Sequence, residues 1–137
     1  MTTEFTIQQA AKITGLTDHT LRYYERIGLI LDQRRNTSGY RVYGDVDLEY
    51  ISFLRQLKAT GMPLAQMQQF AQLRRAGDHT AAERRHLLEV HRRTVKQQMA
   101  DLNACLAMID YKIERQREKE QQHEQQHPSR PTSTGQP

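Results

Sequence analysis

Cysteine, proline and long apolar segments are all scarce in this chain of 137 residues. Its single cysteine excludes an intrachain disulfide and a zinc site built on cysteines. No apolar run approaches the roughly 20 residues that span a bilayer. The N-terminal segment also lacks the basic-then-apolar layout of a signal peptide. From these absences we expect a cytoplasmic protein without a membrane partner.

Apolar side chains are also too few for one large core to which every residue contributes. They make up 36% of the chain against 26% charged residues, and the mean hydropathy is -0.85. Part of the chain must therefore be an exposed helix, a helix covered by a partner, or a disordered tail. The formal net charge is +4, and most of that excess lies in residues 1–76. This mild excess permits nucleic-acid binding without requiring it.

Four short helices are predicted within residues 1–76, because four apolar stretches each follow a residue that favours a helix N-terminus. Those four residues are Thr6, Thr17, Asp45 and Pro63. Thr6 also fits a capping box with Gln9, in which each side chain satisfies a backbone N–H group of the other. Residues 29–43 differ, since β-prone ends flank a turn-rich centre. They predict a hairpin with strands of about four residues.

One long helix is predicted from residue 80, because no helix breaker occurs again before Pro128. Apolar residues along it recur mostly in alternating steps of four and three, which is the heptad pattern of a coiled-coil seam. The predicted dimerisation residues are Leu88, Val95, Met99, Leu102, Leu106, Ile109 and Ile113. A helix of this length with nothing after it to cover its apolar face needs a partner, and the simplest partner is a second copy. Residues 119–137 contain no apolar side chain to bury and predict a disordered tail.

Three segments carry a family resemblance in their order along the chain. They are TLRYYERIGLI, GYRVYGDVDLEYISFLRQLKATGMPLAQM and the long C-terminal helix. Together they resemble the MerR family of bacterial transcription regulators over about residues 4–115. The resemblance implies a mainly α fold, with a winged helix-turn-helix DNA-binding domain over 1–76 and a long antiparallel coiled-coil dimerisation helix over 80–118.

The resemblance also implies which residues contact DNA. The implied contacts are Thr17, Thr20, Arg22, Tyr23, Tyr24 and Arg26 on a recognition helix, Arg41 and Tyr43 on a wing, and Lys58 beside the operator centre. Arginine can bind guanine or phosphate with two parallel hydrogen bonds, whereas Tyr, Thr and Lys mainly position the backbone. Alternatives stay open, because Tyr24 shares a face with Leu21 and can be a core residue. Arg26 can pair with Glu25 or Asp32 instead, and Arg34 and Arg35 can be solvated turn residues.

This interpretation predicts a homodimer that binds a near-palindromic element of double-stranded promoter DNA. The regulator would distort the promoter spacer so that RNA polymerase holoenzyme aligns with both promoter elements. A non-transcriptional variant would bend DNA as an architectural or recombination accessory protein. The alternative from another class is a coiled-coil interaction protein, and the interleaved arginines and tyrosines argue against it. No nucleophile–base pair, phosphate loop or metal-ligand cluster indicates an enzyme or a cofactor.

The thiols that sensor branches of the family use are missing from the expected places. QLKATGMPL and MIDYKIE resemble the aldehyde- and electrophile-responsive branch, but Ser52 and Gln56 stand in the helix that carries its sensor cysteine. Cys105 adjoins the seam and is interpreted as a small buried hydrophobe, with redox or electrophile sensing as the alternative. His123 and His127, four residues apart in the predicted tail, could bind a metal weakly.

Overall fold

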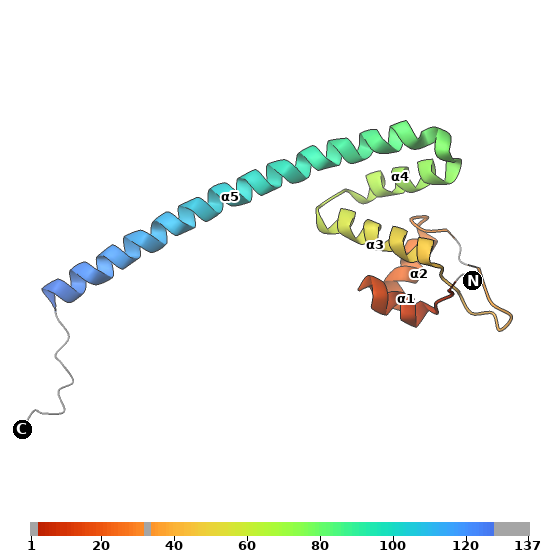
Figure 1. Ribbon diagram of the computed structural model, residues 1–137, viewed down its shortest axis with the longest axis horizontal. Helices are drawn as coiled ribbons and strands as arrows, with labels where there is room; N and C mark the ends of the chain where they lie inside the picture. Colours follow the sequence, from red (N-terminus) through yellow and green to blue (C-terminus); the bar gives the residue numbers. More distant parts are fainter. Residues whose placement is uncertain (1–2, 32–33, 128–137) are drawn as a thin grey trace, which may run out of the picture. The chain divides into compact units, whose positions relative to one another are not determined.

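The computed structural model describes residues 3–31 and 34–127, and their regular structure is helical. The elements are α1 (Ile7–Thr14), α2 (Asp18–Arg26), α3 (Asp45–Ala59), α4 (Leu64–Ala76), the short 3-10 turn η1 (Asp78–Thr80) and α5 (Ala81–Gln126) (Figure 1). This confirms the mainly α fold class. The chain divides into two compact units, one ending at Arg93 and the other beginning at Thr94, so α5 starts in the first and continues in the second.

A tight turn joins α1 to α2, and the local sequence determines it. The Thr6 hydroxyl accepts from the Gln9 N–H at 3.1 Å, and the Gln9 side chain accepts from the Thr6 N–H at 2.9 Å, which confirms the capping box. Gly15 ends α1 with a φ of 76°, a left-handed conformation that favours glycine. The Thr17 hydroxyl then accepts from the Thr20 N–H at 3.0 Å and begins α2.

The core of the first unit draws on α1 to α4 and on the loop between α2 and α3. Its largest fully buried side chains are Tyr24, Tyr43, Leu21, Leu29, Ile51, Leu54 and Met67. Leu88, a predicted dimerisation residue, packs against this core from the beginning of α5. The buried His91 joins the same unit through its Nε2 atom, which lies 2.7 Å from the Thr60 hydroxyl at the end of α3. The first turns of α5 therefore belong to the N-terminal unit.

Between α2 and α3, residues 34–43 form a hairpin shorter than predicted, in which the Asn36 and Val42 N–H groups donate to the Tyr40 and Arg34 carbonyls. Within its described residues, the ladder is a single antiparallel bridge between Arg35 and Arg41. The Asn36 side-chain oxygen accepts from backbone N–H groups two and four residues later, both at 3.0 Å, and these bonds close the turn locally. A second bridge, between Phe5 and Tyr43, ties the end of the loop to the segment before α1. We call residues 34–43 the wing.

Helix α5 runs to Gln126, past the boundary at residue 118 that the sequence predicted. The start of the predicted disordered tail is corrected accordingly, and residues 128–137 lie outside the described residues. Gln, Glu and Lys are good helix formers that need no apolar burial. Ion pairs within the helix, such as Arg115 with Glu118 at 3.7 Å, add modest support.

The predicted seam on α5 is uncovered in the single chain from Met99 onward. Exposed fractions there run from 45% at Ile113 to 69% at Leu102. Cys105 is exposed as well, so this chain by itself does not provide the burial predicted for its thiol. Among the described residues, no helix combines the length and apolarity needed to cross a membrane. The apolar stripe of α5 is therefore exposed to solvent in the single chain.

Candidate nucleic-acid interface

Helix α2 has one face in the core and another in solvent. Leu21 and Tyr24, three residues apart, are 0% and 2% exposed and anchor the helix. Arg22, Tyr23 and Arg26 are exposed on its other side. Arg22 makes an exposed ion pair with Asp18 at 3.3 Å, and the Arg26 guanidinium carbon lies 5.5 Å from the Tyr23 ring centre. Exposed contacts of this kind are weak, so these side chains can exchange them for phosphate or base edges.

At the N-terminus of α2, two predicted contact residues are engaged with each other. The Thr17 hydroxyl lies 2.9 Å from the Thr20 hydroxyl, at an exposed position. Backbone N–H groups at a helix N-terminus favour anions, since they carry partial positive charge. The start of α2 therefore suits a phosphate or a base edge.

An ion pair holds the wing against α2. The Arg41 Nε atom lies 3.0 Å from Glu25 Oε2, and the two side chains are 23% and 9% exposed. Arg35 supports the wing turn by donating from Nη1 to the Gly39 carbonyl at 3.0 Å. Tyr40, the next residue, projects into solvent with 71% of its surface exposed. The wing thus has an anchored base and an aromatic side chain free at its turn.

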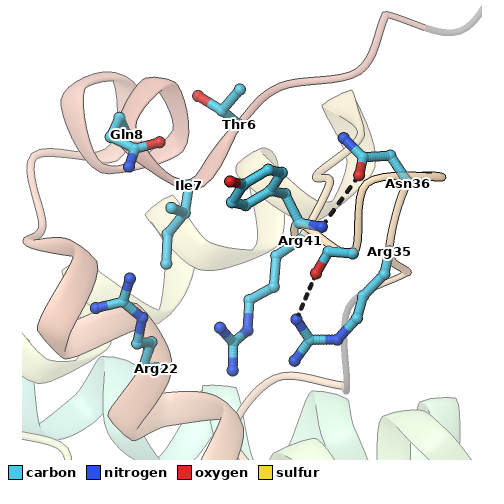
Figure 2. Close-up of a pocket in the computed structure, with 9 residues that line it drawn as sticks. Thr6, Ile7, Gln8, Arg22, Arg35, Asn36 and Arg41 are labelled. Atoms are coloured by element: carbon cyan, nitrogen blue, oxygen red, sulfur yellow. Dashed lines mark hydrogen bonds between the residues drawn. The ribbon is translucent and has the colours of Figure 1, made fainter.

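A hollow of about 340 Å³ lies between the start of α1, α2 and the wing. Its lining includes Thr6, Gln8, Arg22, Arg35, Tyr40 and Arg41. Arg22 from α2 and Arg35 and Arg41 from the wing all line this hollow, and Figure 2 shows the Arg35 and Arg41 guanidinium groups extending in the same direction. Three cations brought together in this way favour binding of a polyanion backbone.

Tyr24 and Tyr43 do not fit the predicted role in DNA contact. They are 2% and 0% exposed, and within the described part of the chain their hydroxyls have no hydrogen-bond partner. Burial raises the pKa of Tyr43 above its usual value of 10.0, and the nearby Glu25 carboxylate raises it further. Both rings pack in the core. For Tyr24 this is the alternative that the sequence left open, in which it is a core residue on the same face as Leu21. Sequence reasoning instead left Tyr40 out of the predicted contacts, although its place beside Gly39 in the turn signalled exposure.

The other basic candidates lie on α3 and around the wing. Lys58 is exposed in the last turn of α3, with its Nζ atom 5.9 Å from the Tyr24 ring centre. Arg55, one turn earlier and absent from the predicted contacts, lies over the turn between α1 and α2. A Cβ added at Gly15 would come within 2.6 Å of its Nη1 atom. Arg34 is exposed and lies 3.9 Å from Glu4, as expected for a solvated residue.

Comparison with known proteins identifies the family to which this arrangement belongs. Residues 5–73 match the model of the MerR HTH family regulatory proteins, and residues 48–111 match the model described as MerR, DNA binding. The chain belongs to the MerR family. It is a helix-turn-helix transcriptional regulator, as the resemblance implied.

Individual MerR relatives support the assignment over most of the chain. An HTH-type transcriptional regulator of Haemophilus influenzae is 38% identical over 109 residues, which are 80% of this chain and 81% of that protein. HiNmlR is a MerR family regulator that lacks the sensor domain, and its crystal structure is bound to promoter DNA. It matches with a TM-score of 0.77 at 36% identity, over 88% of this chain and 94% of that one. A MerR family regulator from Bacillus thuringiensis matches with a TM-score of 0.74 at 34% identity, over 82% and 99% of the two chains.

Proposed function

We propose that this MerR-family chain acts as a homodimer that binds a near-palindromic promoter element and distorts its spacer to control transcription initiation. The observation that carries the proposal is the convergence of Arg22, Arg35 and Arg41 on one hollow beside the exposed face of α2. A recognition helix flanked by a basic wing is a geometry that reads the major groove while contacting the flanking phosphates.

The uncovered stripe on α5 supports the proposed dimer. We propose that two copies pair antiparallel along Val95, Met99, Leu102, Leu106, Ile109 and Ile113. Because Leu88 packs against its own core, its contribution to the pairing is at most partial. A twofold dimer carries two equivalent recognition helices, and a near-palindromic element presents two equivalent half-sites to them.

Within each half-site we divide the contacts by chemistry. Arg22, Tyr23 and Arg26, on the exposed face of α2, are proposed to reach base edges and the adjacent backbone, with Thr17 and Thr20 at the start of the helix. The proposed phosphate contacts are Arg41 and Tyr40 from the wing and Lys58 from α3. Backbone contacts set register and orientation, and base contacts set sequence preference.

The output we propose is a change in DNA shape. HiNmlR in complex with promoter DNA supports a promoter as the target. The Glu25–Arg41 ion pair holds recognition helix and wing together, which favours deformation of the DNA over deformation of the protein. In this proposal the distorted spacer aligns the two promoter elements so that RNA polymerase holoenzyme can contact both.

Selection of bound genomic fragments with the purified protein tests this function. The expected result is enrichment of fragments that share an inverted repeat located between promoter elements. Footprinting on such a fragment should then show two protected half-sites with a hyperreactive centre, where the DNA is distorted. Enrichment of no common sequence would refute the proposal and would favour a coiled-coil protein that binds other proteins.

A further inference from the structure

Two histidines lie beside each other at the C-terminal end of α5, His123 in its last turn and His127 directly after its final residue. His123 and His127 are four residues apart, and their ring centres lie 5.1 Å from each other. The His127 N–H donates to the His123 carbonyl at 2.7 Å, so the helical turn includes both residues. Both side chains are exposed to solvent. In a disordered tail such a pair would have no fixed separation, but on a helix the separation is set by the backbone.

Two imidazoles at this spacing have the geometry of a bidentate metal ligand. Zinc–nitrogen bonds are about 2.0–2.1 Å long, so two nitrogens at a tetrahedral angle lie about 3.4 Å apart. Rings with centres 5.1 Å apart can bring one nitrogen each to that separation by rotation of the side chains. Histidines four residues apart on one helical face are also the pair that holds zinc in helical metal sites.

We propose that His123 and His127 form a binding site for a divalent transition metal ion. Imidazole nitrogens bind Cu²⁺, Ni²⁺ and Zn²⁺. The general order of affinities for divalent metals predicts the tightest binding for Cu²⁺. Among the described residues no group of three His, Cys, Asp or Glu side chains is placed to hold a metal ion. The protein therefore supplies two ligands here, and water fills the remaining positions.

The helical state of residues 119–126 makes this site more than a chance pair. A preorganised pair loses less conformational freedom when it binds than a flexible pair does. Conversely, a metal ion bound to both rings should stabilise the helical conformation of this turn relative to its unfolded conformation, because only the helical conformation holds both rings in place. The site uses no residue of the proposed DNA interface, so metal binding and DNA binding can be tested separately.

Calorimetric titration of the full chain with Ni²⁺ tests the site. We expect one ion per chain, and a loss of affinity of about tenfold to a hundredfold in His123→Ala or His127→Ala, because chelation by the second ring is lost. Unchanged affinity in either variant would overturn the proposal. DNA affinity in metal-free buffer should stay at the wild-type value in both variants, which separates this result from a failure of the proposed function.

A matched exchange distinguishes geometry from histidine content. The double substitution Gln122→His with His123→Gln keeps the number of imidazoles but places them five residues apart, on different faces of the helix. It should lose as much Ni²⁺ affinity as His123→Ala. The control His86→Ala removes an exposed histidine elsewhere on α5 and should change nothing. If the exchange variant binds Ni²⁺ as the wild type does, or if His86→Ala weakens binding equally, the paired site is refuted.

Discussion

Replacement of Leu102 by aspartate is the sharpest test of the proposed dimer. Leu102 is 69% exposed in the single chain and lies in the middle of the proposed seam. Pairing of two helices would bury this side chain. Because the proposed dimer has twofold symmetry, Leu102 of each of the two copies would be buried. The substitution should therefore separate the dimer into monomers while leaving the N-terminal unit folded, since the core of that unit does not include residue 102.

The expected magnitude follows from the exposed fraction. Full burial of a leucine side chain stabilises by about 1.5–3 kcal/mol, so covering the exposed 69% contributes roughly 1–2 kcal/mol per copy. Two copies give about 2–4 kcal/mol, which makes Leu102→Ala weaken the dimer by about 30-fold to 700-fold. Leu102→Asp adds the penalty of desolvating two carboxylates, several kcal/mol for each ion. The aspartate variant should therefore be monomeric at micromolar concentration.

Sedimentation equilibrium of both variants measures this directly, with Ala104→Asp as the matched control. Ala104 is exposed, lies two residues away and falls off the seam, so its substitution adds the same charge on the outer face. The control should remain as dimeric as the wild type. If Leu102→Asp is an unchanged dimer, or if Ala104→Asp dissociates equally, the seam assignment is refuted.

Other substitutions test the interface and the core. Arg41→Ala should weaken binding to all DNA sequences and reduce the slope of log affinity against log salt by about 0.9, because one phosphate contact is lost. Arg22→Ala should in addition remove about 1–3 kcal/mol of base discrimination, measurable with operator variants. Tyr24→Phe should leave DNA affinity unchanged, since its buried hydroxyl has no hydrogen-bond partner among the described residues; a large loss would return Tyr24 to the interface. Burial raises the pKa of Tyr43 and Tyr50, so the folded state retains protons that the unfolded state releases. Stability is therefore full below pH 10 and should fall as pH rises above it, and Tyr43→Phe should lessen that fall in chemical denaturation.

Much of the fold was predictable from local sequence. Capping residues such as Thr6 and Thr17 act on their own first turns, so the starts of α1 and α2 followed from neighbours in sequence. The wing was predicted with strands that are too long, because a turn closed by the Asn36 side chain needs no extended ladder. Helix α5 continues past residue 118 because Gln, Glu and Lys favour a helix without apolar burial, so a lack of apolar residues does not by itself predict disorder.

The interface was only partly predictable, because the type of a residue does not reveal whether its side chain is buried in the core or exposed to solvent. Tyr24 and Tyr43 have the chemistry of DNA contacts, yet their rings fill the core, whereas Tyr40 has the same chemistry and is exposed. Leu88 fits the step pattern of the seam but is held by its own unit. Both distinctions depend on tertiary packing, which the periodicity of one segment does not contain.

The Glu25–Arg41 ion pair has a consequence for the kinetics of DNA binding. An immobilised arginine has already lost rotamer freedom, so its capture by a phosphate costs less entropy, by about 0.5–1.5 kcal/mol. The Glu25 carboxylate also cancels part of the positive charge of Arg41. This weakens the long-range attraction to DNA that accelerates association. Because Arg41 is held at 3.0 Å by a side chain only 9% exposed, this wing should contribute more to a slow dissociation rate than to a fast association rate.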